Sequence, residues 1–319
     1  MKAIRVHQFG DPAVLQLEDM PEPSPQADQV LVRIEAAGVN PVDTYIRAGT
    51  YARKPDLPFT PGIDGAGTVA AVGPGVTQVK VGDRAYGGWP SSGTYAEFAL
   101  YQTSALYALP AALTFEQGAA IFVPYSTAYR ALFLKGHAQP GNTVLIHGAT
   151  GGVGLAATQL AVAAGMRVLG TGGTDAGRSL VAAQGAQVFD HHAVNYGEEI
   201  LAATNGQGAD VILEMLANAN LGKDLDLVAA GGRIVVIGSR GPVEINPRAL
   251  MAKEASLTGL TLFNTPAPEL EKIQMGLQTG LQNGTLKPVV NRAFPLAQAA
   301  EAHEQVLRPG ALGNLVLTP

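Results

Sequence analysis

The chain contains no cysteine among its 319 residues. This absence excludes disulfide bonds, zinc sites with cysteine ligands and catalysis by a thiol. Charged residues are scarce as well, at 15% of the chain, and the formal net charge is −5. Because nucleic acids and membrane surfaces are themselves anionic, this balance disfavours a general binding surface for either of them.

Long hydrophobic runs are also missing. Hydrophobic residues make up 47% of the chain, which predicts a sizeable core, but glycine or polar residues interrupt each run. No run approaches the roughly 20 apolar residues that a membrane-spanning helix needs. The N-terminal MKAIRVHQFG alternates like a β-strand and lacks the apolar core of a signal peptide. We therefore expect a globular cytoplasmic protein without a membrane segment.

The pattern of predicted elements changes near residue 122. Before it, runs such as AIRVHQF and QVLVRIEAAGV predict strands of an antiparallel, partly closed β-barrel. After it, strands alternate with helices, one of them predicted over residues 219–231, which indicates a parallel sheet with helices on both faces. The tail predicts two helices and a last strand that could complete the first domain. The expected class is α/β, with domains at 1–122, 123–265 and 266–319.

A glycine-rich turn follows the first strand of the alternating region. The sequence VLIHGATGGVGLAATQLA, residues 144–161, places glycines between a predicted strand and a predicted helix. Backbone amides at such a helix N-terminus bind phosphate, and glycines let a diphosphate approach the backbone. Two registers of the dinucleotide fingerprint fit, one starting at Ala149 and one at Gly152. The sequence leaves this choice open, but either register predicts a dinucleotide site.

The end of the next strand bears on the choice between NAD and NADP. An NAD site usually has an acidic residue there for the ribose 2′-hydroxyl, whereas residues 170–174 are GTGGT. Arg178 could pair with a 2′-phosphate, which favours NADP(H). Asp175 could instead take the acidic role, but capping the following helix is its simpler function. His191 and Tyr196 are further candidates for the adenosine end.

Several motifs together resemble the zinc-free quinone oxidoreductase, or zeta-crystallin-like, branch of the medium-chain dehydrogenase/reductase superfamily. They include GVNPVDTYIRAGTY, PFTPGIDGAGTVAAVG, STAYRAL, EMLANANL and GGRIVVIGSRGPVEINPR, together with the glycine loop. The resemblance covers essentially the whole chain. It implies a GroES-like β-barrel domain, a Rossmann domain with a doubly wound parallel sheet, and a tail that returns to the first domain. It also implies NADPH-dependent reduction of quinones without zinc.

The positions that hold the catalytic metal in the zinc enzymes of this superfamily carry no suitable ligands here. By the resemblance these positions are Asn40, Ile63 and about Val123. An amide and two alkyl side chains do not make a tetrahedral zinc site, so no metal is expected. None of the six histidines forms an obvious spaced pair with a carboxylate, and the neighbours His191 and His192 are expected to point apart on a strand.

The resemblance also implies site residues. Tyr45, Asn40 and Thr127 are expected near the nicotinamide and substrate, where a tyrosine hydroxyl could donate a hydrogen bond to a developing oxyanion. The remaining cofactor contacts are expected at the carboxyl ends of the parallel strands, where ligands of this fold bind. These residues are Thr150, Gly151, Gly152, Val153, Gly173, His191, Asn218, Asn220, Ile237, Gly238, Ser239, Arg240, Leu260, Thr261 and Leu262. Arg240 is a second candidate for the 2′-phosphate.

Alternative functions remain open at the level of sequence. The same cleft would suit NADPH-dependent reduction of an enone or enal, because these resemble half a quinone. A protein of another class, NADPH-stabilised and either RNA-binding or structural like a crystallin, is disfavoured by the net charge and by the lack of a basic, aromatic-interleaved run. Relatives implied by the resemblance are homodimers or tetramers, and residues 254–262 offer an edge strand for pairing. The sequence leaves open which electron acceptor is physiological, and whether reduction proceeds by hydride transfer or by single-electron transfer.

Overall fold

The computed structural model describes all residues from Met1 to Pro319. The chain divides into two compact units. The first unit comprises Met1–Val123, Lys287–Pro309 and Gly313–Pro319, and the second comprises Pro124–Leu286 and Gly310–Leu312. The predicted tail 266–319 is thus shared: its long helix lies in the second unit and its last helix and strand lie in the first. No helix is both long and apolar enough to cross a bilayer.

The first unit is built around a seven-stranded sheet with the order β14-β15-β3-β4-β5-β7, and β6 pairs with β3. All neighbours are antiparallel except β14 and β15. The alternating pattern of the long β3 buries side chains that pack with Tyr95, Tyr101 and Phe294 in one core. The elements are β1 (Lys2–Arg5), β2 (Gln16–Asp19), β3 (Gln29–Val39), α1 (Pro41–Arg47), β4 (Gly65–Val72), β5 (Arg84–Gly87), β6 (Phe98–Gln102), β7 (Leu106–Ala108), α2 (Phe115–Gly118), β14 (Val290–Pro295), α10 (Ala299–Gln305) and β15 (Asn314–Thr318).

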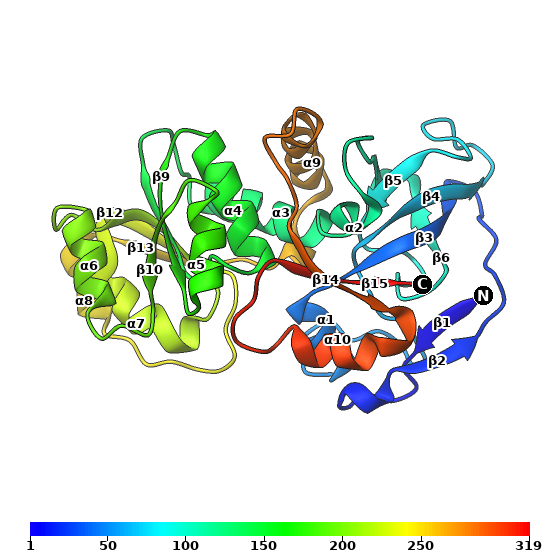
Figure 1. Ribbon diagram of the computed structural model, residues 1–319, viewed down its shortest axis with the longest axis horizontal. Coiled ribbons are helices and arrows are strands. Elements are labelled where there is room, and N and C mark those ends of the chain that lie inside the picture. Colours follow the sequence, from blue (N-terminus) through cyan, green and yellow to red (C-terminus); the bar gives the residue numbers. More distant parts are fainter. The chain divides into compact units, whose positions relative to one another are not determined.

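The second unit contains a six-stranded, fully parallel sheet with the order β10-β9-β8-β11-β12-β13. This is the doubly wound order of the Rossmann fold. Right-handed crossovers place α4 and α5 on one face and α6, α7 and α8 on the other, as Figure 1 shows. The elements are α3 (Phe122–Tyr129), β8 (Thr143–Ile146), α4 (Gly152–Ala163), β9 (Arg167–Gly172), α5 (Asp175–Ala182), β10 (Gln187–Asp190), α6 (Tyr196–Ala203), β11 (Ala209–Glu214), α7 (Ala217–Leu227), β12 (Val228–Val236), α8 (Pro247–Lys253), β13 (Ser256–Gly259) and α9 (Ala267–Gln282).

The predicted fold class is confirmed by this architecture, with differences in detail. The helix expected over residues 219–231 ends at Leu227, because Val228 already pairs with Ala209 of β11 as the first residue of β12. The sequence pattern did not predict several short elements, namely α1, α2, α3, α8, β2, β5 and β14. A six-residue π-helical turn, η3 (Arg130–Lys135), continues α3.

Candidate active site

The glycine loop joins β8 to α4. Gly148 has φ +61°, a left-handed conformation that favours glycine. A Cβ added to Gly154 would lie 2.4 Å from the Gly148 oxygen and 2.6 Å from the Ala149 Cα, so α4 can pack on the loop only without a side chain there. Close packing of helix and strand is the role of the last fingerprint glycine. The structure therefore favours the register that starts at Ala149 and ends at Gly154.

The N-terminus of α4 has the features of a diphosphate site. Gly151 is its N-cap residue, and no side chain caps the helix. The first amides of a helix have no partners within the helix, and the helix dipole adds positive potential there. A Cβ on Gly151 would make only one ordinary contact, with the Gly148 oxygen at 3.7 Å, so packing within the protein does not require glycine at this position. Since packing within the protein leaves room for a side chain at Gly151, the absence of one is explained by the close approach of a dinucleotide diphosphate.

Three later segments follow the carboxyl ends of β11, β12 and β13, on the same edge of the sheet. The Asn218 Oδ1 accepts a hydrogen bond from the Arg240 amide at 2.8 Å, which joins the first two segments. The Asn220 Nδ2 donates to Glu214 Oε1 at 3.3 Å. In the third segment the Thr261 carbonyl accepts a hydrogen bond from Arg130 at 2.9 Å. The residues expected to contact the cofactor at this edge thus lie on segments that follow neighbouring strand ends.

Arg178 lies where the adenosine end was expected, but it is already paired. It donates to the Gly172 carbonyl at 3.2 Å, forms ion pairs with Asp175 and with Asp190 at 3.1 Å, and is about a quarter exposed. The helix cap is Thr174 and not Asp175, which is the first helical residue. Asp190 ends the neighbouring strand and is aligned with Gly172, so an acid does lie at this corner although residues 170–174 contain none.

The expectation that His191 and His192 point apart is wrong. The strand β10 ends at Asp190, and the two rings meet edge to face with centroids 4.4 Å apart. Both Nε2 atoms lie 2.7 Å from where a Cβ on Gly173 would be, so these three residues form one small cluster. Tyr196 does not join this cluster, because its ring is buried in the core. The Lys223 Nζ lies over this ring, 4.9 Å from its centroid. The position of Tyr196 does not support a contact with adenosine.

The first unit contains a buried polar cluster around Asn40, the N-cap residue of α1. Its Nδ2 donates to Asp64 Oδ2 at 2.9 Å, and its amide donates to Asp43 Oδ2 at 2.8 Å. The second oxygen of Asp64 accepts from the Val123 amide at 2.9 Å. Burial raises the pKa of Asp64 well above its usual range and that of Asp43 to about 7, although hydrogen bonds from Asn40 oppose both shifts. Both carboxyl groups are thus poised to hold a proton.

Tyr45 lies on the same short helix, α1, and is partly exposed. Its carbonyl accepts hydrogen bonds from the amides of Thr50 and Tyr51, which fix the end of the helix. Its hydroxyl makes no hydrogen bond within the protein and is therefore available to a ligand. Thr127 belongs to the second unit, where it is 6% exposed on α3.

Comparison with known proteins gives matches along the chain. Residues 26–111 match the family model of an alcohol dehydrogenase GroES-like domain, and residues 152–275 match that of a zinc-binding dehydrogenase. The quinone oxidoreductase of Homo sapiens is 50% identical over 320 residues, which cover 99% of this chain and 97% of the relative. The chain belongs to the quinone oxidoreductase family. Its resemblance to the medium-chain dehydrogenase/reductase superfamily is confirmed.

Two solved structures illustrate the range of this superfamily. An NAD-dependent alcohol dehydrogenase superimposes with a TM-score of 0.93 at 29% identity, each chain covered in full. A mycobacterial protein complexed with NADPH superimposes with a TM-score of 0.91 at 33% identity, again over both full chains. The quinone oxidoreductase fold is therefore shared by proteins that differ in cofactor, and the choice of cofactor depends on local residues.

In this member of the quinone oxidoreductase family, Asp64 connects two of the positions that hold zinc in the metal enzymes. Its carboxyl group accepts from the side chain of Asn40 and from the backbone of Val123, and Ile63 precedes it in the sequence. The side-chain amide of Asn40 and the backbone amide of Val123 therefore both donate their hydrogen bonds to Asp64. The absence of a metal here remains a prediction.

Sequence reasoning missed two charged pairs of the second unit, one partly buried and one fully buried. Arg130 pairs with Glu269 at 2.5 Å and holds the Thr261 carbonyl, and its guanidinium is 6% exposed. His147 pairs with Asp224 at 2.8 Å directly beneath the glycine loop. Local patterns give little signal for either pair, because the partners lie far apart in the sequence and only the fold joins them.

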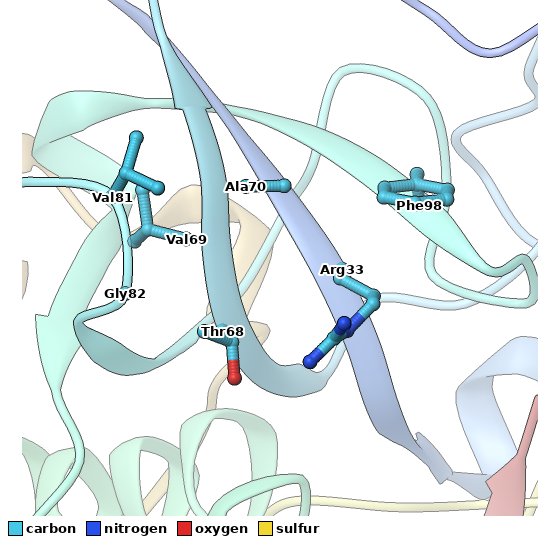
Figure 2. Close-up of a pocket in the computed structure, with 7 residues that line it drawn as sticks. All are labelled: Arg33, Thr68, Val69, Ala70, Val81, Gly82 and Phe98. Carbon is cyan, nitrogen blue, oxygen red and sulfur yellow. The ribbon is translucent and has the colours of Figure 1, made fainter.

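A separate hollow in the first unit, about 380 Å³ in volume, contains none of the expected site residues. Figure 2 shows its lining, with Arg33 and Thr68 at one end and Val81 near Val69. Arg33 is paired with Glu35 at 3.0 Å on an exposed strand face. The hollow therefore adds nothing to the candidate active site.

Proposed function

We propose that this chain is an NADPH-dependent quinone reductase. The observation that carries the proposal is 50% identity with a quinone oxidoreductase over 99% of the chain. The uncapped N-terminus of α4 with its glycine turn supports a dinucleotide cofactor. The substrate class is a small-molecule quinone. The cofactor, when bound, supplies the reducing equivalents, as a hydride or as single electrons.

NADPH is favoured over NADH by the adenosine end. The stretch 170–174 contains no carboxylate that would repel a 2′-phosphate, and Arg178 lies beside it. Because Asp175 and Asp190 already pair with Arg178, a 2′-phosphate would have to compete with these carboxylates. Arg240 and the His191–His192 pair are the other donors proposed for this end. A mycobacterial structural neighbour at 33% identity is complexed with NADPH.

Tyr45 and Asn40 are proposed to orient the substrate and the nicotinamide, with Thr127 as a further contact. The conversion of a quinone to a hydroquinone consumes two electrons and two protons, and the oxyanion that forms first is delocalised over the ring. A hydrogen bond from the free Tyr45 hydroxyl would stabilise that oxyanion. The buried amide of Asn40 is held rigidly by Asp64, so its orientation is fixed before a ligand binds.

A second candidate is reduction of an enone or enal. One structural neighbour is named as the enoyl reductase CurK, at 25% identity and a TM-score of 0.90 over 99% of this chain. Conjugate reduction would use the same cofactor and the same hydrogen-bond donors, since an enone presents one carbonyl where a quinone presents two.

The function is tested with the purified protein by measuring oxidation of NADPH and of NADH with phenanthrenequinone and with a linear enal. We expect turnover of the quinone with NADPH at a kcat/KM at least about tenfold above that for the enal or with NADH. Turnover of the enal alone would replace the first proposal by the second. Tighter binding of NADH than of NADPH in a fluorescence titration would overturn the argument from residues 170–174.

Arg178→Ala tests the contact with the 2′-phosphate. Because a charge-assisted hydrogen bond contributes about 1.5–3 kcal/mol, we expect the Kd of NADPH to rise about tenfold or more, and that of NADH to remain unchanged. Arg240→Ala removes the same charge from the second candidate, so the larger loss of NADPH affinity shows which of the two arginines contacts the phosphate. An equal loss of affinity for NADPH and for NADH in Arg178→Ala would show that Arg178 stabilises the local fold and does not contact the 2′-phosphate.

We further propose a cytoplasmic homodimer that pairs through β13. This strand is at the edge of the six-stranded sheet, and Leu257 and the neighbouring Met251 expose apolar side chains. Exposed backbone donors and acceptors on an edge strand favour pairing with a second copy. Sedimentation velocity would check the proposal, and a monomer at micromolar concentration would contradict it.

A further inference from the structure

A buried cluster of His147, Asp224 and Glu214 lies under the proposed cofactor site. His147 stands between β8 and the glycine loop, Glu214 is the last residue of β11, and Asp224 is on α7. Their side chains are between 0% and 2% exposed. The His147 Nε2 is 2.8 Å from Asp224 Oδ1 and 4.0 Å from Glu214 Oε2. Nothing in the proposed mechanism uses these groups.

The cluster contacts three of the segments expected to hold the dinucleotide. On one side, the Thr171 hydroxyl joins it to the glycine loop, because it lies 3.4 Å from His147 Nδ1 and accepts from the Gly148 amide at 3.2 Å. On the other side, Glu214 Oε1 accepts from the Leu216 amide and from Asn220 Nδ2. The Glu214 carbonyl also accepts from the amides of Ile237, at 2.8 Å, and Gly238.

The spacing of the cluster suits a shared proton. Two ligands of one tetrahedral zinc ion lie about 3.3 Å apart, whereas His147 and Asp224 are at hydrogen-bond distance. His147 Nε2, Glu214 Oε2 and both oxygens of Asp224 have no well-aligned hydrogen-bond partner in the protein, so the 2.8 Å contact between His147 and Asp224 is an ion pair. Two buried carboxylates without donors would be costly, and a proton shared with Glu214 removes one of the charges.

We propose that His147, Asp224 and Glu214 form a buried proton-sharing triad that holds the glycine loop and the segments of Asn220 and Gly238 in the arrangement that binds NADPH. His147 and Glu214 act here as positioning residues, through the backbone and side chains that they hold. In the binding arrangement Glu214 is neutral, so its buried carboxyl group adds no negative charge beneath the diphosphate. The inference rests on the proposed use of NADPH.

The charged surroundings give the pH range in which this arrangement holds. Burial disfavours a charge on His147, but its close contact with Asp224 and attraction by Asp224 and Glu214 raise its pKa above the usual value, against repulsion by Lys223 on α7. Burial raises the pKa of Glu214 to about 7, with His147 lowering it and Asp224 raising it. His191 is the other titratable group that interacts with His147. As the pH rises through about 7, Glu214 gains a negative charge, and NADPH affinity should fall.

The test is the pH dependence of NADPH binding in Glu214→Gln, measured by fluorescence titration. Glutamine keeps the acceptor for Leu216 and Asn220 but does not ionise. Between about pH 6 and pH 8.5 we expect the Kd of the wild type to rise ~3- to 30-fold more than that of the variant. Asp226→Asn, an exposed change of equal charge on α7, the helix that carries Asp224, should keep the wild-type profile. An identical pH profile in wild type and Glu214→Gln would overturn the triad.

Hydrogen exchange of the amides from Gly148 to Gly154 in the free protein separates the triad from the proposed function. We expect protection of these amides to decrease above pH 7 in the wild type, relative to Glu214→Gln, whether or not NADPH binds. Wild-type protein that fails to bind NADPH at any pH would contradict the proposed function alone. Equal protection in both proteins across the pH range would contradict the triad alone, even with normal binding of NADPH.

Discussion

Replacing Gly154 with alanine is expected to abolish NADPH binding and to lower the thermal stability of the protein. The added Cβ would lie within 2.4–2.8 Å of backbone atoms of Gly148 and Ala149, and backbone cannot rotate out of the way as a side chain can. Overpacking of this kind costs about 1–3 kcal/mol or more. Because α4 must move away from the loop, its first amides would no longer meet the diphosphate. Fluorescence titration with NADPH and thermal unfolding measure the two effects.

Two other glycines provide controls. Gly222→Ala changes an exposed helical position where nothing lies within 4 Å, so it should leave binding unchanged and stabilise α7 by about 0.5–1 kcal/mol. Gly151→Ala should keep the stability of the wild type but weaken NADPH binding, because its Cβ meets only one protein atom at 3.7 Å and otherwise faces the proposed ligand. Undiminished NADPH binding in Gly154→Ala would disprove the assigned role of this glycine.

Replacing Asp43 with asparagine is expected to increase stability above neutral pH by about 2–4 kcal/mol, at roughly 1.4 kcal/mol for each unit of pKa shift. Burial raises the pKa of Asp43 to about 7 from 3.8. A group whose pKa is raised in the folded state contributes its full stability below the unfolded pKa. That contribution is lost as the pH rises through the folded pKa, here between about 4 and 7. Asparagine reproduces the neutral acid and does not ionise.

Denaturant unfolding at several pH values between about 4 and 8 measures this difference. The free energies of unfolding of wild type and Asp43→Asn should agree near pH 4 and diverge as the pH rises. The amide oxygen of the introduced asparagine would still accept the hydrogen bond that the Asn40 amide donates to Asp43 in the wild type. Asp56→Asn removes an equal charge from an exposed position of the same unit and serves as the control. Parallel curves for wild type and Asp43→Asn would mean that Asp43 is ionised in the fold at low cost.

Much of the fold could be predicted because it depends on patterns of neighbouring residues along the chain. The strands around β8 are continuous apolar runs, with Val144, Leu145 and Ile146 all completely buried, as a sheet covered on both faces requires. The boundary at Val228 could not be predicted, because helix propensity continues through the alanines and only pairing with Ala209 of β11 ends α7. The pairing of His191 with His192 was missed for the same kind of reason, since both residues were expected on a strand and β10 ends before them, at Asp190.

The sequence by itself determined the βα alternation, the glycine turn, the absence of thiol chemistry and the family to which the chain belongs. These properties depend on residue types and on neighbours along the chain. Only the tertiary structure decided the register of the glycine loop, the partners of Arg178, and the buried groups around Asn40 and His147. Arg130 and Glu269, for example, are 139 residues apart in the sequence. The protonation of buried carboxyl groups such as Asp43 depends on the atoms that surround them after folding, and these atoms come from segments that no local pattern relates.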